Sequence, residues 1–102
     1  MKIIAGSRWK SAVCATEVVV VKVPKAPGEL QCGGSAMLPM NAEKPAGAAP
    51  AAGQGGGTLL GKHYVDEQQG LEVLCTKAGQ GSIAFDGRPL AIRAAKLLPS
   101  SD

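Results

Sequence analysis

The feature that most constrains how this chain can fold is a weak internal repeat. Residues 6–22, with the sequence GSRWKSAVCATEVVVVK, align without gaps on residues 61–77, GKHYVDEQQGLEVLCTK, at an offset of 55 positions. Four aligned pairs are identical: Gly6 and Gly61, Glu17 and Glu72, Val18 and Val73, Lys22 and Lys77. A repeat at a fixed offset predicts two structural units of the same kind.

The aromatic residues strengthen this alignment. The only tryptophan, Trp9, falls on the only tyrosine, Tyr64, and the residues before them, Arg8 and His63, can both carry positive charge. After a gap of two residues the match resumes at three more pairs: Gly28 with Gly81, Leu30 with Ile83, Gly34 with Gly87. The alternative explanation is two unrelated sets of strands that share common glycine turns.

Both halves of the chain have the sequence pattern of β-structure. Residues 16–23 are rich in β-branched valine, which favours strands. Residues 71–77 largely alternate, which places Leu71 and Val73 on one face of a strand and Glu72 on the other. We therefore expect these two segments to form the central strands.

Turn residues divide the rest of the chain into further short strands. Asp86-Gly87 is a preferred sequence for a two-residue type I′ hairpin. The expected strands around the turns are residues 29–32, 36–40, 82–85 and 90–93. The sequence thus predicts a small all-β barrel or sandwich of two similar three-stranded units, related by a pseudo-twofold axis. A short helical turn near residues 91–98 is an alternative for the C-terminal end.

A segment of small residues separates the two halves. Thirteen of the seventeen residues in 41–57 are Ala, Gly or Pro, and none is a large hydrophobe. Such a segment cannot offset the entropy cost of being ordered, so we expect a flexible linker or loop. The 102 residues then form one domain, with a first β unit at 1–40 and a second unit with the C-terminal tail at 58–102.

Charge and cysteine content limit the functional classes. The formal net charge of +3 is spread along the chain, and three aromatic residues are few for nucleic-acid stacking. No stretch has the apolar length of a signal peptide or a membrane span. The three cysteines are widely spaced, which is typical of reduced thiols in the cytoplasm. We expect a cytoplasmic protein that binds neither nucleic acid nor membrane.

The candidate binding residues are the two aligned dipeptides, Arg8-Trp9 and His63-Tyr64. An aromatic ring beside a cation suits an anionic, partly apolar ligand or the centre of a protein interface. The competing interpretation is structural. An aromatic side chain near the start of a β unit commonly covers the end of a small core, and the neighbouring cation is then simply solvated.

Catalytic and metal chemistry have less support in the sequence. Cys14, Cys32, Cys75 and His63 could supply four zinc ligands, but no two of them have the close spacing that structural zinc sites usually contain. A thiol enzyme would need His63 as a base, oriented by Glu72 or Asp66, and nothing fixes such partners. Cys75 is expected to pack as a small hydrophobe, whereas Cys32, before two glycines, is expected to be more exposed. No cofactor or metal is predicted.

These observations favour a non-enzymatic β module that binds a protein partner or itself. Sixteen of the hydrophobic residues are alanine, which leaves few large side chains for a core. At the usual stability per residue such a domain is stable by about 4 to 12 kcal/mol, so contacts between protomers can matter. The alternative is a small-molecule binding protein or small enzyme with its site at Arg8, Trp9, His63 and Tyr64.

Overall fold

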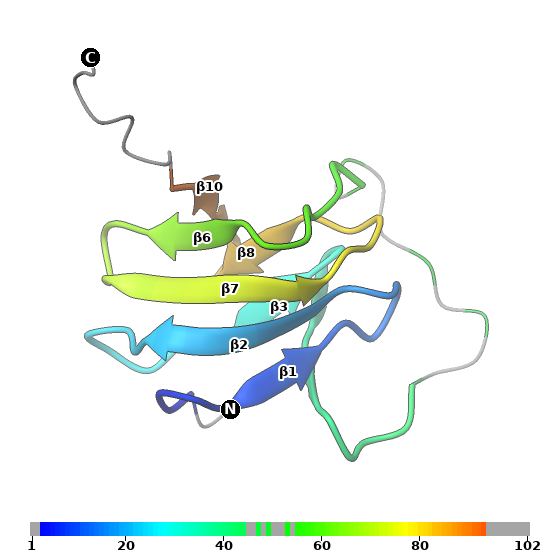
Figure 1. Cartoon of the computed structure of the whole chain (residues 1–102), viewed down its shortest axis with the longest axis horizontal. Coiled ribbons are helices and arrows are strands. Elements are labelled where there is room, and N and C mark those ends of the chain that lie inside the picture. Colours follow the sequence, from blue (N-terminus) through cyan, green and yellow to red (C-terminus); the bar gives the residue numbers. More distant parts are fainter. Residues whose placement is uncertain (1–2, 45–46, 48, 50–52, 54, 94–102) are drawn as a thin grey trace.

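In the computed structural model the described residues form an all-β domain with ten strands (Figure 1). It describes residues 3–44, 47, 49, 53 and 55–93. The first five strands are β1 (Arg8–Lys10), β2 (Glu17–Lys22), β3 (Leu30–Cys32), β4 (Ser35–Ala36) and β5 (Leu38–Pro39). The second five are β6 (His63–Asp66), β7 (Leu71–Lys77), β8 (Ile83–Phe85), β9 (Arg88–Pro89) and β10 (Ala91–Ile92). No helix of the length and apolar character needed to cross a membrane occurs among these described residues.

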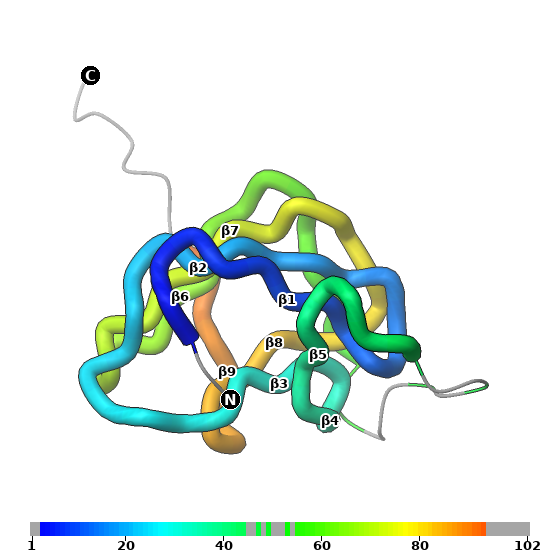
Figure 2. Tube along the Cα trace, turned by 90° about the horizontal axis from the view of Figure 1, so that it is seen from below, coloured from blue at the N-terminus to red at the C-terminus, as the bar shows by residue number. Residues whose placement is uncertain are grey.

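The strands form two antiparallel sheets packed face to face (Figure 2). One sheet has six strands in the order β10-β6-β7-β2-β1-β5, and the other has four in the order β4-β3-β8-β9. The pairings of the described residues end at β10 and β5 in one sheet and at β4 and β9 in the other, so the sheets do not close into a barrel.

The strand order of each sheet is symmetric. If each of β1–β5 is exchanged with its counterpart five strands later, the order is unchanged when read from the opposite edge. The register agrees as well: Trp9 lies opposite Val18 between β1 and β2, and Tyr64 lies opposite Val73 between β6 and β7. Between these hairpins, β2 and β7 pair antiparallel at the centre of the six-stranded sheet. The two units therefore correspond in topology and register, while their origin by duplication stays a prediction.

Equivalent tight turns connect β3 to β4 and β8 to β9. In the first, Gly33 and Gly34 have φ of 64° and 88°; in the second, Asp86 and Gly87 have φ of 51° and 80°. Two consecutive positive φ values define the type I′ turn, which matches the twist of the flanking strands. The turn predicted from Asp86-Gly87 is confirmed, and its counterpart has the same conformation.

The sequence predicts three strands in each unit, whereas the described residues form five in each, so several predicted elements need correction. Segment 36–40 is divided into β4 and β5, with Met37 buried between them. The predicted hairpin strand 90–93 is also wrong, because β9 (Arg88–Pro89) pairs with β8 and Leu90 is buried after it. Residues 91–92 form strand β10 instead of the start of a helical turn, because they pair with β6; residues 94–98 lie outside the described residues. The sequence pattern predicts no strand at β1 or β6, which are three and four residues long. Pairing with neighbouring strands, not local pattern, makes these segments extended.

The core lies between the two sheets and is supplied by both units. The buried hydrophobic cluster consists of Trp9, Val18, Val20, Leu30, Cys32, Met37, Tyr64, Leu71, Val73, Cys75, Ile83, Phe85 and Leu90. Leu71 and Val73 point inward from β7, as the alternation predicts. Burying a Val, Leu or Phe side chain contributes about 1.5 to 3 kcal/mol, so this shared cluster stabilises the packing of the two sheets.

The described residues of 41–57 belong to no helix or strand. Both ends of this segment are attached to the domain. At one end Lys44 Nζ donates a hydrogen bond to the carbonyl oxygen of Cys14 over 2.5 Å. At the other, Thr58 forms an antiparallel bridge with Gly79. Lys44 and Thr58 therefore contact the domain at the β1–β2 loop and at residue 79, respectively.

Candidate functional site

The structure buries both aromatic rings of the predicted site. Trp9 is 8% exposed and Tyr64 is 5% exposed. The rings lie on β1 and β6, which are separated by β2 and β7 in the sheet. Trp9 and Tyr64 therefore occupy equivalent places in the core but do not come from adjacent strands.

Each ring uses its polar atom to hold the beginning of its own unit. Trp9 Nε1 donates to Ser7 Oγ over 3.1 Å, and the Leu59 N–H donates to the Tyr64 hydroxyl over 2.9 Å. Buried Trp and Tyr usually find such a partner. This arrangement favours the structural interpretation, in which the rings cover the ends of the core.

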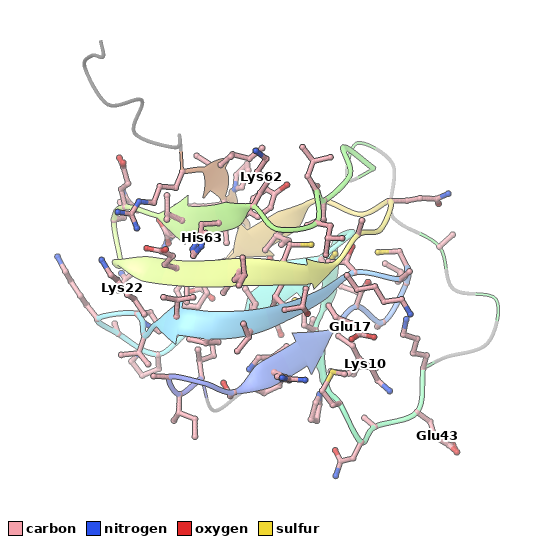
Figure 3. The ribbon with its side chains drawn as sticks, viewed as in Figure 1. Lys10, Glu17, Lys22, Glu43, Lys62 and His63 are labelled. Atoms are coloured by element: carbon pink, nitrogen blue, oxygen red, sulfur yellow. The ribbon has the colours of Figure 1, made fainter. Side chains whose placement is uncertain are left out.

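The other two predicted residues lie on the opposite face of the same sheet. Arg8 is exposed and His63 is partly exposed, because successive side chains of a strand point to opposite faces. Figure 3 labels His63 and Lys22 on this outer face of the six-stranded sheet. The four predicted residues thus do not converge on one pocket.

His63 belongs to an ion-pair cluster around Glu72. His63 Nδ1 lies 2.6 Å from Glu72 Oε2, and Arg93 Nη1 lies 3.1 and 3.2 Å from the two carboxylate oxygens. Lys22 Nζ is 3.9 Å from Oε1. The Glu72 side chain is only 4% exposed, so these three partners cover a carboxylate on the solvent side of the sheet.

The environment of Glu72 changes its acidity. Burial would raise the pKa of this carboxyl, but the hydrogen bond with His63 and the positive charge of Arg93 outweigh burial and hold the pKa below its usual value. Glu72 is therefore a well-satisfied anion. The two carboxylate oxygens already have partners in His63, Arg93 and Lys22, and no cluster of three or more potential metal ligands occurs in the described part of the chain.

Sequence reasoning placed Glu72 on the polar face and missed its burial. One signal could have indicated its partners. Lys22 pairs with Glu72 across the central strands, and Lys77 pairs with Glu17 at 4.0 Å in the equivalent place. These four residues are also the charged ones among the four identical positions of the alignment, since Glu17 aligns with Glu72 and Lys22 with Lys77.

An apolar cleft of about 290 Å³ opens beside the end strand β10. Its lining residues are Gly56, Gly57, Leu59, Tyr64, Ser82, Ile83, Pro89, Leu90 and Ile92. Leu59 is 55% exposed and Ile92 is 46% exposed, and Leu60, next in the chain, is 65% exposed. Of the four predicted residues, only Tyr64 lines this cleft. Tyr64 also packs in the core, and the sequence does not distinguish these two positions of the ring.

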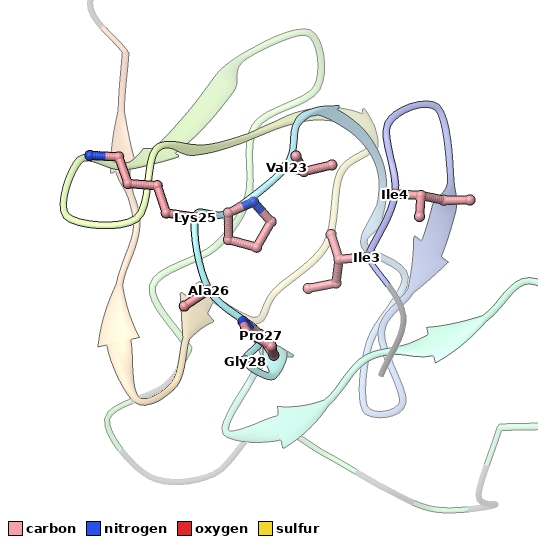
Figure 4. A pocket seen from close by; sticks show the side chains of 8 residues that line it. Ile3, Ile4, Val23, Lys25, Ala26, Pro27 and Gly28 are labelled. Carbon is pink, nitrogen blue, oxygen red and sulfur yellow. The ribbon is translucent and has the colours of Figure 1, made fainter.

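A larger cleft of about 420 Å³ lies at the start of the first unit (Figure 4). Ile3 and Ile4 face a connection that runs from Val23 to Gly28. In the second unit the equivalent of Ile3 is Thr58, which is bridged to Gly79. The second unit therefore closes by a backbone bridge at a place where the first unit has an open cleft.

The three thiols are free, and the structure brings two of them together. Cys14 Sγ lies 3.8 Å from Cys32 Sγ. Cys75 is buried, as expected, but Cys32 is also fully buried, which corrects the expectation that it is more exposed. The reason is that residue 81 packs directly against Cys32. His63 lies on the outer face and the core cysteine Cys75 on the inner, so the suggested Cys–His arrangement does not form there.

The chain was compared with models of protein families, with curated proteins and with solved structures. None of the three comparisons gives a match. The candidate sites therefore stand on their geometry.

Proposed function

We propose that this chain is a non-enzymatic β module that self-associates through the edge formed by strand β10. A second copy of the chain would be the occupant of the apolar surface made by Leu59, Leu60 and Ile92. The observation that carries the proposal is the high exposure of these three side chains beside the end strand of the six-stranded sheet.

An open sheet edge invites pairing with another strand. Among the described residues, β10 pairs with β6 on one side only, and both of its residues are exposed. Large apolar side chains next to such an edge add contact area to the backbone hydrogen bonds. This combination supports association by strand addition.

A second copy is favoured because identical edges can pair about a twofold axis. The domain already contains such a pairing internally, since the equivalent strands β2 and β7 run antiparallel at its centre. Residues 55–65, which supply Leu59 and Leu60, include only one fully charged side chain, Lys62, so charge repulsion between two such edges is small. The pseudo-twofold relation of the two units and a cytoplasmic location remain parts of this proposal.

Binding of another protein at the same edge is the nearest alternative. A small-molecule site at Arg8, Trp9, His63 and Tyr64 has less support, because the rings are buried and Arg8 and His63 lie on the other face of the sheet.

Sedimentation equilibrium over a range of protein concentrations tests the proposal. The wild-type chain should form a dimer, and Leu60→Asp should weaken association at least tenfold by placing a charge in the apolar contact. Ile4→Asp is the matched control, because Ile4 aligns with Leu59 and has the same 55% exposure at the other edge. A wild-type chain that stays monomeric, or an Ile4→Asp variant that dissociates as readily as Leu60→Asp, would overturn the proposal.

A further inference from the structure

The β1–β2 loop, residues 11–16, carries Cys14 over the edge of the core. Cys14 is partly exposed, whereas Cys32 on β3 is fully buried behind it. Their sulfurs are 3.8 Å apart, and a disulfide bond is about 2.05 Å long, so a small side-chain rotation would join them. The pair combines one reachable thiol with one protected thiol.

Three polar groups surround the sulfur of Cys14. The hydroxyl oxygens of Ser11 and Thr16 lie 3.2 and 3.3 Å from Sγ, and the Gly81 N–H donates to Sγ over 3.3 Å. Ser11 and Thr16 are both fully buried. Such side chains keep their hydroxyls fixed, which prepares them to donate to a negative sulfur.

The direction of the Ser11 hydroxyl follows from its other contacts. Ser11 Oγ accepts hydrogen bonds from the N–H groups of Val13 and Cys14, at 3.0 and 3.1 Å. Its lone pairs are thereby occupied, so its own proton is free to point at Cys14 Sγ. The Ser11 hydroxyl and the Gly81 N–H are thus both placed to donate to an ionised Cys14 sulfur, whereas the protonated thiol donates to Thr16 Oγ1.

Two glycines allow the backbone to approach both sulfurs. A Cβ on Gly79 would lie 3.0 Å from Cys14 Sγ and would overlap Thr16, and a Cβ on Gly81 would lie 3.0 Å from Cys32 Sγ. Neither glycine has a positive φ, so the turn conformation does not require them. Close approach to Thr16 at Gly79, and to the Gly33 backbone at Gly81, is the main physical reason for glycine at these positions, and the thiols add to it.

The two thiols differ in acidity. Burial would raise the pKa of Cys14, but hydrogen bonds from Ser11, Thr16 and Gly81 outweigh burial and lower the pKa to about 6. Burial, with a smaller contribution from the Cys14 charge, raises the pKa of Cys32 to about 11. At neutral pH Cys14 is the thiolate and Cys32 the thiol, which is the division of roles between an attacking and a resolving cysteine.

We propose that Cys14 and Cys32 form a redox-active dithiol that closes to an intramolecular disulfide by exchange with a small-molecule disulfide. The Cys14 thiolate attacks one sulfur of the external disulfide, forms a mixed disulfide and releases one external thiolate. Cys32 then attacks Cys14 Sγ, passes its proton to the departing thiolate and completes the internal bond. The chain loses two thiols, and one external disulfide becomes two thiols.

The first step prepares the second. Once Cys14 is in a mixed disulfide it no longer carries the negative charge that contributes to the raised pKa of Cys32. Ionisation of Cys32 then becomes easier at the stage where it must act.

The test uses the reduced full-length chain in buffers of increasing oxidised-to-reduced glutathione ratio. Free thiols are counted, and peptide mapping locates the bond. We expect a Cys14–Cys32 disulfide with Cys75 still reduced, and Cys32→Ser should instead stop at a mixed disulfide of Cys14 with glutathione. At pH 7 an alkylating reagent should label Cys14 at least tenfold faster than the buried Cys75.

Cys75→Ser is the matched control and should behave as the wild type, because the Cys75 thiol is engaged with the Lys77 carbonyl oxygen, to which it donates over 3.2 Å. Circular dichroism checks that each variant is folded. The proposal is overturned if the folded wild-type chain keeps all three thiols at every ratio, if the bond includes Cys75, or if Cys14→Ser loses its thiols as fast as the wild type.

Discussion

The loop between β1 and β2 and the loop between β6 and β7 share one side-chain cap but differ in backbone conformation and in chemistry. In the first, Ser11 Oγ accepts a hydrogen bond from the Val13 N–H at 3.0 Å; in the second, Asp66 Oδ1 accepts one from the Gln68 N–H at 3.3 Å. These donors and acceptors are 55 positions apart. A side-chain acceptor two residues before its donor fixes both turns.

The two loops differ in what the capping side chain does next. Asp66 binds Arg88 Nη2 at 2.7 Å, whereas the Ser11 hydroxyl lies 3.2 Å from Cys14 Sγ. Equivalent capping residues thus support an ion pair in one unit and a thiol pair in the other. The comparison teaches that the shared fold provides the positions and that side-chain size and polarity decide the chemistry.

The core behind each loop shows the same principle. Gly28 packs against Phe85, and the aligned Gly81 packs against Cys32. The aromatic ring fills its end of the core, whereas the smaller cysteine leaves space that Ser11 and Cys14 occupy. The thiol pair exists in the first unit because a small residue stands where the second unit has its only phenylalanine.

The largest expected effect comes from truncating the equivalent aromatic residues. Trp9→Ala and Tyr64→Ala should each reduce the free energy of unfolding by about 3 to 5 kcal/mol, because each leaves a cavity in the core. Urea denaturation of both single variants and the double variant measures this. Similar losses would sharpen the equivalence of the two units. A folded double variant with unchanged stability would contradict the burial of the rings and restore them as surface binding residues.

A medium effect should separate Glu72 from its counterpart Glu17. Glu72→Gln should cost about 1 to 3 kcal/mol at neutral pH, because the carboxylate is buried while its partners are partly exposed. Glu17→Gln should change stability by less than about 0.5 kcal/mol, since it removes one exposed pair. Because the pKa of Glu72 is lowered in the folded state, its contribution is present above pH 4.5 and is lost as the pH falls below that value.

Thermal unfolding of the wild type and both variants from neutral to acidic pH measures this difference. The stability gap between the wild type and Glu72→Gln should narrow as the pH falls. A gap that stays constant, or an equal gap for Glu17→Gln, would mean that the cluster around Glu72 is not specific to the second unit.

The smallest effect is expected in the segment that joins the units. Deleting residues 47–54 should change stability by less than about 1 kcal/mol, because the entropy of closing a loop varies slowly with its length. Thermal melts of the deletion variant provide the measurement. A fall of many degrees would show that the two units depend on specific contacts of this segment.

The sequence by itself determined the features that depend on local pattern. Valine-rich and alternating segments predicted the central strands, Asp86-Gly87 predicted its hairpin, and the repeat aligned residues that the structure pairs in the same register. Such signals are read within a few residues, so they are present in the chain before it folds.

Only the tertiary structure decided which side chains share a site. Cys14 and Cys32 are 18 positions apart, and their contact depends on how the β1–β2 loop meets the second sheet. Glu72 is buried because His63 reaches it from the adjacent strand β6 and Arg93 from the position after β10, although alternation alone makes its face polar. Trp9 and Tyr64 align in the sequence, which fits either a core position or a surface site. The opposite sheet buries both rings, so they pack in the core. Burial and proximity are properties of packed sheets, and no local spacing specifies them.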